Sequence, residues 1–151
     1  MIVPGQRIGP ISLGMGMDTV LATLGKPSWS FINNGDPTKI GTEFDYNSLD
    51  MEIYFSSGAA PAVTGISVVA NPRTRMEIGK IVWSDIGPFN DVFSTTQGTR
   101  LGSSSFDAAR TYGAYEDQSG ILMTYKQLGM GFSVTRDYRI WRISVVPAGS
   151  R

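Results

Sequence analysis

Two carboxylates, Asp45 and Glu52, are the residues of this sequence whose types and spacing could support acid–base chemistry. They fall in two alternating segments separated by a tight turn, so neighbouring strands would carry them close together. A pair of carboxylates is what a glycoside hydrolase uses. No recognisable catalytic motif accompanies them, so we expect that the chain is not an enzyme and keep a small carboxylate-dependent hydrolase as an alternative.

The composition excludes most other catalytic and metal-binding chemistry. The 151 residues include no His and no Cys. A Ser-His-Asp or Cys-His arrangement within this chain is therefore impossible, and so are thiolate metal sites and disulfides. We expect no metal and no cofactor.

The charge balance argues against a nucleic-acid partner. The chain has 13 basic and 13 acidic residues, whereas a general nucleic-acid binder needs a basic field. Arg136, Arg139 and Arg142 are interleaved with Tyr138 and Trp141, a pattern that could stack on nucleic acid. An exposed edge strand protected by its charges is the favoured interpretation of this segment.

No apolar run is long enough to span a membrane, so a soluble protein without a membrane span is expected. Pro4-Gly5 follows Met1 closely, and no charged and apolar leader is present, so these residues are expected to contain no signal peptide. The compartment stays open: periplasmic or secreted if a signal has been removed, and cytoplasmic otherwise.

The elements that must position these residues occur twice along the chain. Residues 13–25 and 101–113, offset by 88, both read Leu-Gly, ten residues, then Gly, with apolar residues at helical spacing. Residues 44–55 match 123–134 at an offset of 79, and each block predicts two strands joined by a tight turn. At an offset of 77, Ile66-Ser67-Val68-Val69 returns as Ile143-Ser144-Val145-Val146.

This order of helix and three strands, found twice, predicts an α+β fold made of two tandem helix-plus-antiparallel-sheet repeats. The first repeat covers residues 1–70 and the second covers 97–151. Residues 71–96 connect them and could hold an extra strand at 78–83. We expect the whole chain to form one compact domain, with the helices packed on one face of the sheet.

Strand alternation divides the side chains between two faces of the sheet. One face is predicted to be the core that contacts the helices. Its members are Met51, Ile53, Phe55, Ile66, Val68, Met130, Phe132, Val134, Ile143 and Val145.

The first copy reads Leu13-Gly14-Met15, then Val20, then Leu24-Gly25 and Pro27, and a β-hairpin follows. This pattern resembles two related groups, the β-lactamase-inhibitory-protein type with its tandem repeat and the SmpA/OmlA-type lipoproteins with a single unit. The tandem form here looks more like the first group. The resemblance implies a binding module whose sheet presents a protein-interaction surface, and no specific contact residue carries over.

The expected function is therefore non-catalytic binding of an unidentified protein through a sheet face and loop aromatics. Tyr, Trp and Arg dominate the binding energy of protein interfaces, and the predicted face has such residues. An ordinary solvated sheet face is the alternative. The predicted contact residues are Tyr54, Glu52, Lys126, Arg142, Trp29 and Phe31.

Two other functions stay open. A small-ligand protein would use a pocket at the seam between the repeats, lined by Trp83, Phe93 and Trp141. A homodimer would pair an exposed edge strand. Residues 29–41 and 86–96 each belong to one copy only, so these segments are favoured as carriers of function.

Overall fold

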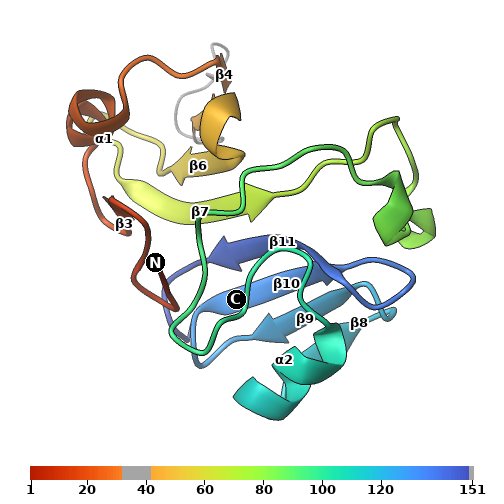
Figure 1. The fold of residues 1–151 in the computed structure, drawn as a ribbon. Coiled ribbons are helices and arrows are strands. Elements are labelled where there is room, and N and C mark those ends of the chain that lie inside the picture. The colour runs from red at the N-terminus through yellow and green to blue at the C-terminus, as the bar shows by residue number, and fades with distance from the viewer. Residues whose placement is uncertain (32–41, 150–151) are drawn as a thin grey trace.

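The computed structural model describes residues 1–31 and 42–149 and has an α+β architecture (Figure 1). Antiparallel strands form a large sheet in the order β4-β5-β6-β7-β11-β10-β9-β8, beside a small sheet β1-β2-β3. The strands are β1 (Ile2–Val3), β2 (Arg7–Ile8), β3 (Ile11–Ser12), β4 (Trp29–Phe31), β5 (Glu43–Tyr46), β6 (Met51–Phe55), β7 (Val63–Val69), β8 (Glu116–Gln118), β9 (Leu122–Tyr125), β10 (Met130–Val134) and β11 (Ile140–Val145).

Strands β7 and β11 pair in the middle of the large sheet and join its two halves, as Figure 1 shows. We call this pairing the seam. It places Ile66 opposite Val145 and Val68 opposite Ile143, so the two related Ile-Ser-Val-Val segments lie antiparallel against each other. Outward from the seam, β6, β5 and β4 follow on one side, and β10, β9 and β8 on the other.

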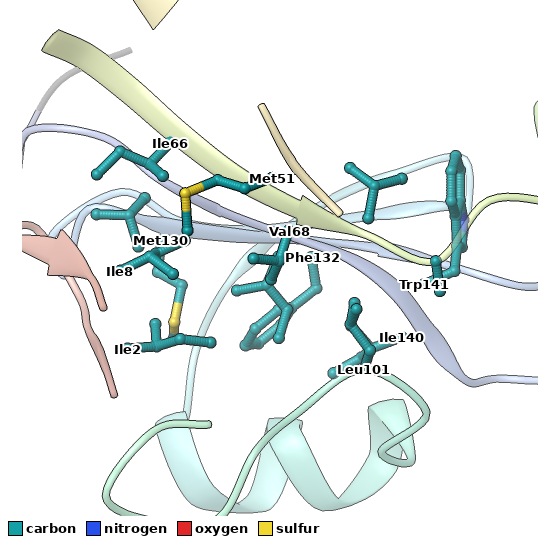
Figure 2. Packing of buried hydrophobic residues seen from close by; sticks show 14 of the residues in the cluster. Ile2, Ile8, Met51, Ile66, Val68, Leu101, Met130, Phe132, Ile140 and Trp141 are labelled. Carbon is teal, nitrogen blue, oxygen red and sulfur yellow. The ribbon is translucent and has the colours of Figure 1, made fainter. Parts of the chain in front are cut away.

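The inner face of the large sheet forms the core, and every predicted core residue is buried, which confirms that prediction. The small N-terminal sheet, which the sequence pattern does not reveal, adds Ile2, Ile8 and Ile11 to the same cluster. Figure 2 shows Ile2 and Ile8 beside Met130 at one end of this cluster and Trp141 at the other.

The two predicted helices are confirmed as α1 (Met17–Leu24) and α2 (Ser105–Tyr112). Both end at a glycine with positive φ, 78° at Gly25 and 83° at Gly113, a conformation that other residues adopt only with strain.

Both helices contact the inner face. The Tyr112 ring of α2 lies 6.0 Å from the Phe132 ring, centroid to centroid. At the end of α1, the Tyr46 hydroxyl donates a hydrogen bond to the Gly25 carbonyl oxygen at 2.9 Å. The outer face of the sheet is thus on the side away from both helices. Neither of the helices in the described part of the chain is long and apolar enough to cross a membrane.

The extra strand suggested for residues 78–83 does not form. Two 3-10 turns, Ile78–Lys80 and Trp83–Asp85, occupy this region. The Asp85 carboxylate accepts a hydrogen bond from the Val82 N–H at 3.0 Å, which stabilises the second turn. The seam already pairs β7 with β11, so the middle of the sheet has no place for a further strand.

The prediction of an edge strand around Arg139 and Arg142 is also wrong. Strand β11 pairs with β7 on one side and β10 on the other, so it is central. Ile140, Ile143 and Val145 are each 0% exposed, and burying these side chains favours the central position. The edges of the large sheet are β4 and β8, three residues each.

Candidate functional site

Arg142 holds together a group of polar side chains on the outer face. Its guanidinium forms an ion pair with Glu52, Nη2 to Oε1, at 2.9 Å. The same nitrogen donates to the Tyr54 hydroxyl at 2.8 Å and to the Ser67 hydroxyl at 3.2 Å. Tyr54 in turn donates to Glu52 Oε1 at 2.5 Å. Each charge therefore has partners, and these side chains have defined positions.

The group crosses the seam. Sheet register places Glu52 opposite Ser67 and Ser67 opposite Ser144, so all three side chains point to the outer face. The Ser67 and Ser144 hydroxyls lie 2.8 Å apart, and Arg142 Nε reaches Ser144 at 3.4 Å. We call the set Glu52, Tyr54, Ser67, Arg142 and Ser144 the seam network.

Two further carboxylates, Glu43 and Asp45, lie beside the seam network on β5. Asp45 is opposite Glu52, and Glu43 is opposite Tyr54. One carboxylate oxygen from each of Glu43, Asp45 and Glu52 lies within 4.8 Å of the others. We call these three residues the acidic cluster.

The acidic cluster perturbs the ionisation of Glu43. Burial, a hydrogen bond with Asp45 and the negative charges of Asp45 and Glu52 raise the Glu43 pKa from 4.5 to about 7, although Arg142 opposes this shift. Near neutral pH, Glu43 therefore exchanges between a protonated carboxyl group, which can donate a hydrogen bond, and a negatively charged carboxylate.

Arg142 and Tyr54 keep their protons at neutral pH. Burial acts to lower the pKa of Arg142, but Glu52 and Tyr54 more than offset it, and the pKa lies above its ordinary value. Burial and the hydrogen bond to Glu52 raise the pKa of Tyr54 above 10. The seam network thus presents a fixed guanidinium and a fixed phenol.

The acidic cluster has the oxygen ligands that a hard cation such as Ca²⁺ prefers. One of its three carboxylates already has a cationic partner, since Arg142 lies 2.9 Å from Glu52. Asp45 Oδ1 is buried without a hydrogen-bond partner among the described residues. These contacts identify the cluster as a negatively charged patch with one internal countercharge.

Two exposed aromatic side chains extend the outer face. Trp29 lies opposite Asp45 and Phe31 opposite Glu43, so both rings share the face of the acidic cluster. Their exposed fractions are 50% and 42%. The rings stack with centroids 6.2 Å apart and an interplanar angle of 21°. These two residues were predicted in a loop, whereas they lie on edge strand β4.

The other predicted contact residue, Lys126, lies elsewhere. It follows β9 and lines a hollow of about 460 Å³ together with Tyr115 and Tyr125. The structure thus brings Glu52, Tyr54 and Arg142 into contact and places Trp29 and Phe31 on the same face. Lys126 directly follows β9, which is two strands away from β11 in the sheet.

The three aromatic residues predicted to line a seam pocket have separate environments. Trp141 lines a hollow formed with residues 71–81, and neither Trp83 nor Phe93 lines it. Trp83 packs edge-on against Phe89, with ring centroids 5.6 Å apart. The Phe93 ring lies against Gly9.

Three members of the site were not among the predicted contact residues or the predicted carboxylate pair: Glu43, Ser67 and Ser144. Glu43 precedes Asp45 by two positions, so strand alternation already places both on one face. Ser67 aligns with Ser144 in the repeated Ile-Ser-Val-Val segment, a signal that could have identified it. Within the segment 29–41, residues 32–41 lie outside the described part of the chain.

No protein-family model, curated protein or solved structure matches this chain.

The raised pKa of Glu43 makes stability depend on pH. Between pH 4.5 and about 7 the folded chain holds a proton on Glu43 that the unfolded chain releases, so stability falls as pH rises through this window. We expect Glu43→Gln to equal the wild type near pH 4.5 and to be the more stable protein at pH 8. Urea unfolding at both pH values measures this difference.

Glu77→Gln is the control for that experiment, since Glu77 pairs with Lys80 on the surface with its side chain 78% exposed. An equal gain at pH 8 from both variants would contradict the role given to the acidic cluster.

Proposed function

We propose that this chain is a non-catalytic protein-binding module that uses the outer face of its large sheet. One observation carries the proposal: the ordered seam network lies on the same face as the exposed, stacked rings of Trp29 and Phe31. Tyr, Trp and Arg are the residue types that dominate the energy of protein interfaces.

The order of the seam network favours binding. Immobilising a flexible side chain costs about 0.5–1.5 kcal/mol when a complex forms. Arg142 and Tyr54 already have fixed hydrogen-bond partners. Arg142 and Tyr54 have therefore already lost most of their conformational freedom on folding, before a partner contacts them.

The partner surface should be basic. The outer face presents the three carboxylates of the acidic cluster against the single guanidinium of Arg142. A Lys or Arg side chain of the partner near Glu43 would favour its charged form and lower its pKa. Binding would then release a proton, and affinity would rise between pH 6 and pH 8.

We also propose that the two halves of the sheet derive from duplication of one unit. Each half has an eight-residue helix, then a three-residue edge strand, then three longer strands that end at the seam. This order supports the resemblance to the β-lactamase-inhibitory-protein type, which implies a sheet surface for protein recognition.

The test is capture of a partner from a lysate of the native cells by the tagged full chain. We expect a protein retained by the wild type to be lost when Trp29 and Phe31 are both changed to Ser. Phe106→Ser is the matched control, since Phe106 is 56% exposed on α2, away from the outer face. Equal retention by the two variants, or loss only in the control, would assign recognition to another surface.

A carboxylate-dependent hydrolase is the second candidate, favoured by the Glu43 pKa of about 7 beside Asp45. The hollow next to Asp45 and Glu52 has a volume of only about 50 Å³. Substrate pockets are usually about 300 Å³ or larger. The geometry therefore supports binding on a face better than turnover in a cleft.

A homodimer through an edge strand is a third candidate. Each edge strand has three residues, which leaves few main-chain groups for pairing with a second copy. The molar mass from light scattering over a range of concentrations distinguishes a dimer from the monomer that we favour.

A further inference from the structure

A second feature of the molecule, separate from the outer-face site, has the properties of a small-molecule site. A hollow of about 330 Å³ lies between the segment that follows β7 and the side chain of Trp141 on β11. Its wall combines apolar groups with two arginines, and no carboxylate belongs to it. The lining residues used below are Arg73, Arg75, Met76, Ile78, Ile81 and Trp141.

Trp141 reaches this hollow through a β-bulge. Ser133 is opposite Arg142, but Val134 is opposite Ile140, so Trp141 is the extra residue of β11. A bulge redirects a side chain from the regular alternation of the strand. Figure 2 accordingly shows Trp141 at the margin of the core cluster, away from Phe132.

Trp141 is 9% exposed as a residue, and its indole Nε1 is buried without a hydrogen-bond partner within the described residues. Burying an N–H without an acceptor is unfavourable, because the group loses its hydrogen bond to water. A side chain that lines the hollow thus has an N–H for which the described residues supply no acceptor.

Two arginine side chains, Arg73 and Arg75, supply positive charge to the wall. Arg73 donates to the Ser84 carbonyl oxygen at 3.2 Å, and neither Arg73 nor Arg75 forms an ion pair with a described acidic residue. The nearby Glu77 is paired with Lys80 at 3.5 Å. Two guanidinium groups and no carboxylate therefore line the hollow, a combination that favours an anionic ligand.

We propose that this hollow binds a small organic anion. Its carboxylate or phosphate group contacts Arg73 and Arg75, whose planar guanidinium groups suit such oxygens. Its apolar part lies against Trp141, Met76 and Ile81. None of these residues belongs to the seam network or the acidic cluster. A test of this site is therefore independent of the proposed protein-binding face.

The test uses the full chain with Trp29→Phe and Trp83→Phe, so that Trp141 is the only tryptophan left of three. Fluorescence is titrated with hexanoate, phenyl phosphate, inorganic phosphate, hexanol and benzyl alcohol. We expect saturable changes with hexanoate or phenyl phosphate, and binding about tenfold weaker or more for the alcohols and for inorganic phosphate. Comparing hexanoate with phenyl phosphate shows which anionic group is preferred.

Arg73→Gln and Arg75→Gln, made in this reporter chain, should each weaken anion binding by about tenfold. Arg110→Gln is the control, since Arg110 is an exposed residue of α2 that pairs with Asp107. Circular dichroism checks that each variant is folded. The proposal is overturned if no anion gives saturation at millimolar concentration, if the alcohols bind as tightly as the anions, or if the control weakens binding as much as the two arginine variants.

Discussion

Phe132→Ala is expected to lower the free energy of unfolding by about 4 kcal/mol. Phe132 is 0% exposed, and its ring lies 6.0 Å from Tyr112 and 5.8 Å from Tyr125, centroid to centroid. Figure 2 shows it between the sheet and α2, so the substitution leaves a cavity where the helix meets the sheet. Urea unfolding measures the loss.

The matched control for this prediction is Phe106→Ala on α2, whose side chain is 56% exposed. Its expected cost is about 0.5 kcal/mol, as for most surface substitutions. A loss of similar size in the two variants would mean that the packing described between α2 and the sheet is wrong.

Arg142→Met is expected to destabilise the fold by about 2 kcal/mol at pH 8. The Arg142 and Glu52 side chains are 27% and 22% exposed, so the pair lies between a surface and a fully buried ion pair. Without the guanidinium, Glu52 faces Asp45 and Glu43 with no countercharge. The loss should be smaller at pH 4.5, where Glu43 is protonated in both proteins because its pKa is about 7.

Two further variants isolate the charge effect. Arg110→Met breaks an exposed pair with Asp107 and should cost about 0.5 kcal/mol. Glu52→Gln combined with Arg142→Met should be less destabilised at pH 8 than Arg142→Met alone. If the double variant is instead the less stable of the two, the loss comes from packing of the arginine side chain.

Much of the fold could be predicted from residue periodicity. Apolar residues alternate in 51–55 and 130–134, and burial of one side of a strand makes such alternation visible. The helices could be predicted because the apolar spacing of each ends at a glycine, Gly25 or Gly113. The positive φ of these glycines ends each helix. These signals are local, and each depends on a few consecutive residues.

Features that depend on long-range pairing could not be predicted in the same way. Arg139 and Arg142 resemble edge-strand charges, yet β11 is central, since it pairs with β7 and β10 and its isoleucines are buried in the core. Strands β4 and β8 have three exposed residues each, so no hydrophobic alternation marks them. The N-terminal strands have two residues each, too few for any period.

The candidate site was predicted in part for the same reason. Alternation placed Glu52, Tyr54 and Arg142 on one face, but only the seam register puts Arg142 within 2.9 Å of Glu52. Lys126 shares the polar pattern but follows β9, which is two strands away from β11 in the sheet. Alternation identifies the face of a residue, whereas the strand order decides which residues meet.

The seam network also has a consequence for the order in which parts of the structure form. Ser67 and Ser144, which meet at its centre, are 77 positions apart in sequence. Pairing strands over such a separation closes a long loop, the slowest kind of contact to form during folding. Each hairpin can form early by itself, while the seam network exists only after β7 and β11 have paired. Nascent chains still on the ribosome, with β11 inside the exit tunnel, would therefore carry all three acidic residues of the cluster without the arginine that pairs with Glu52.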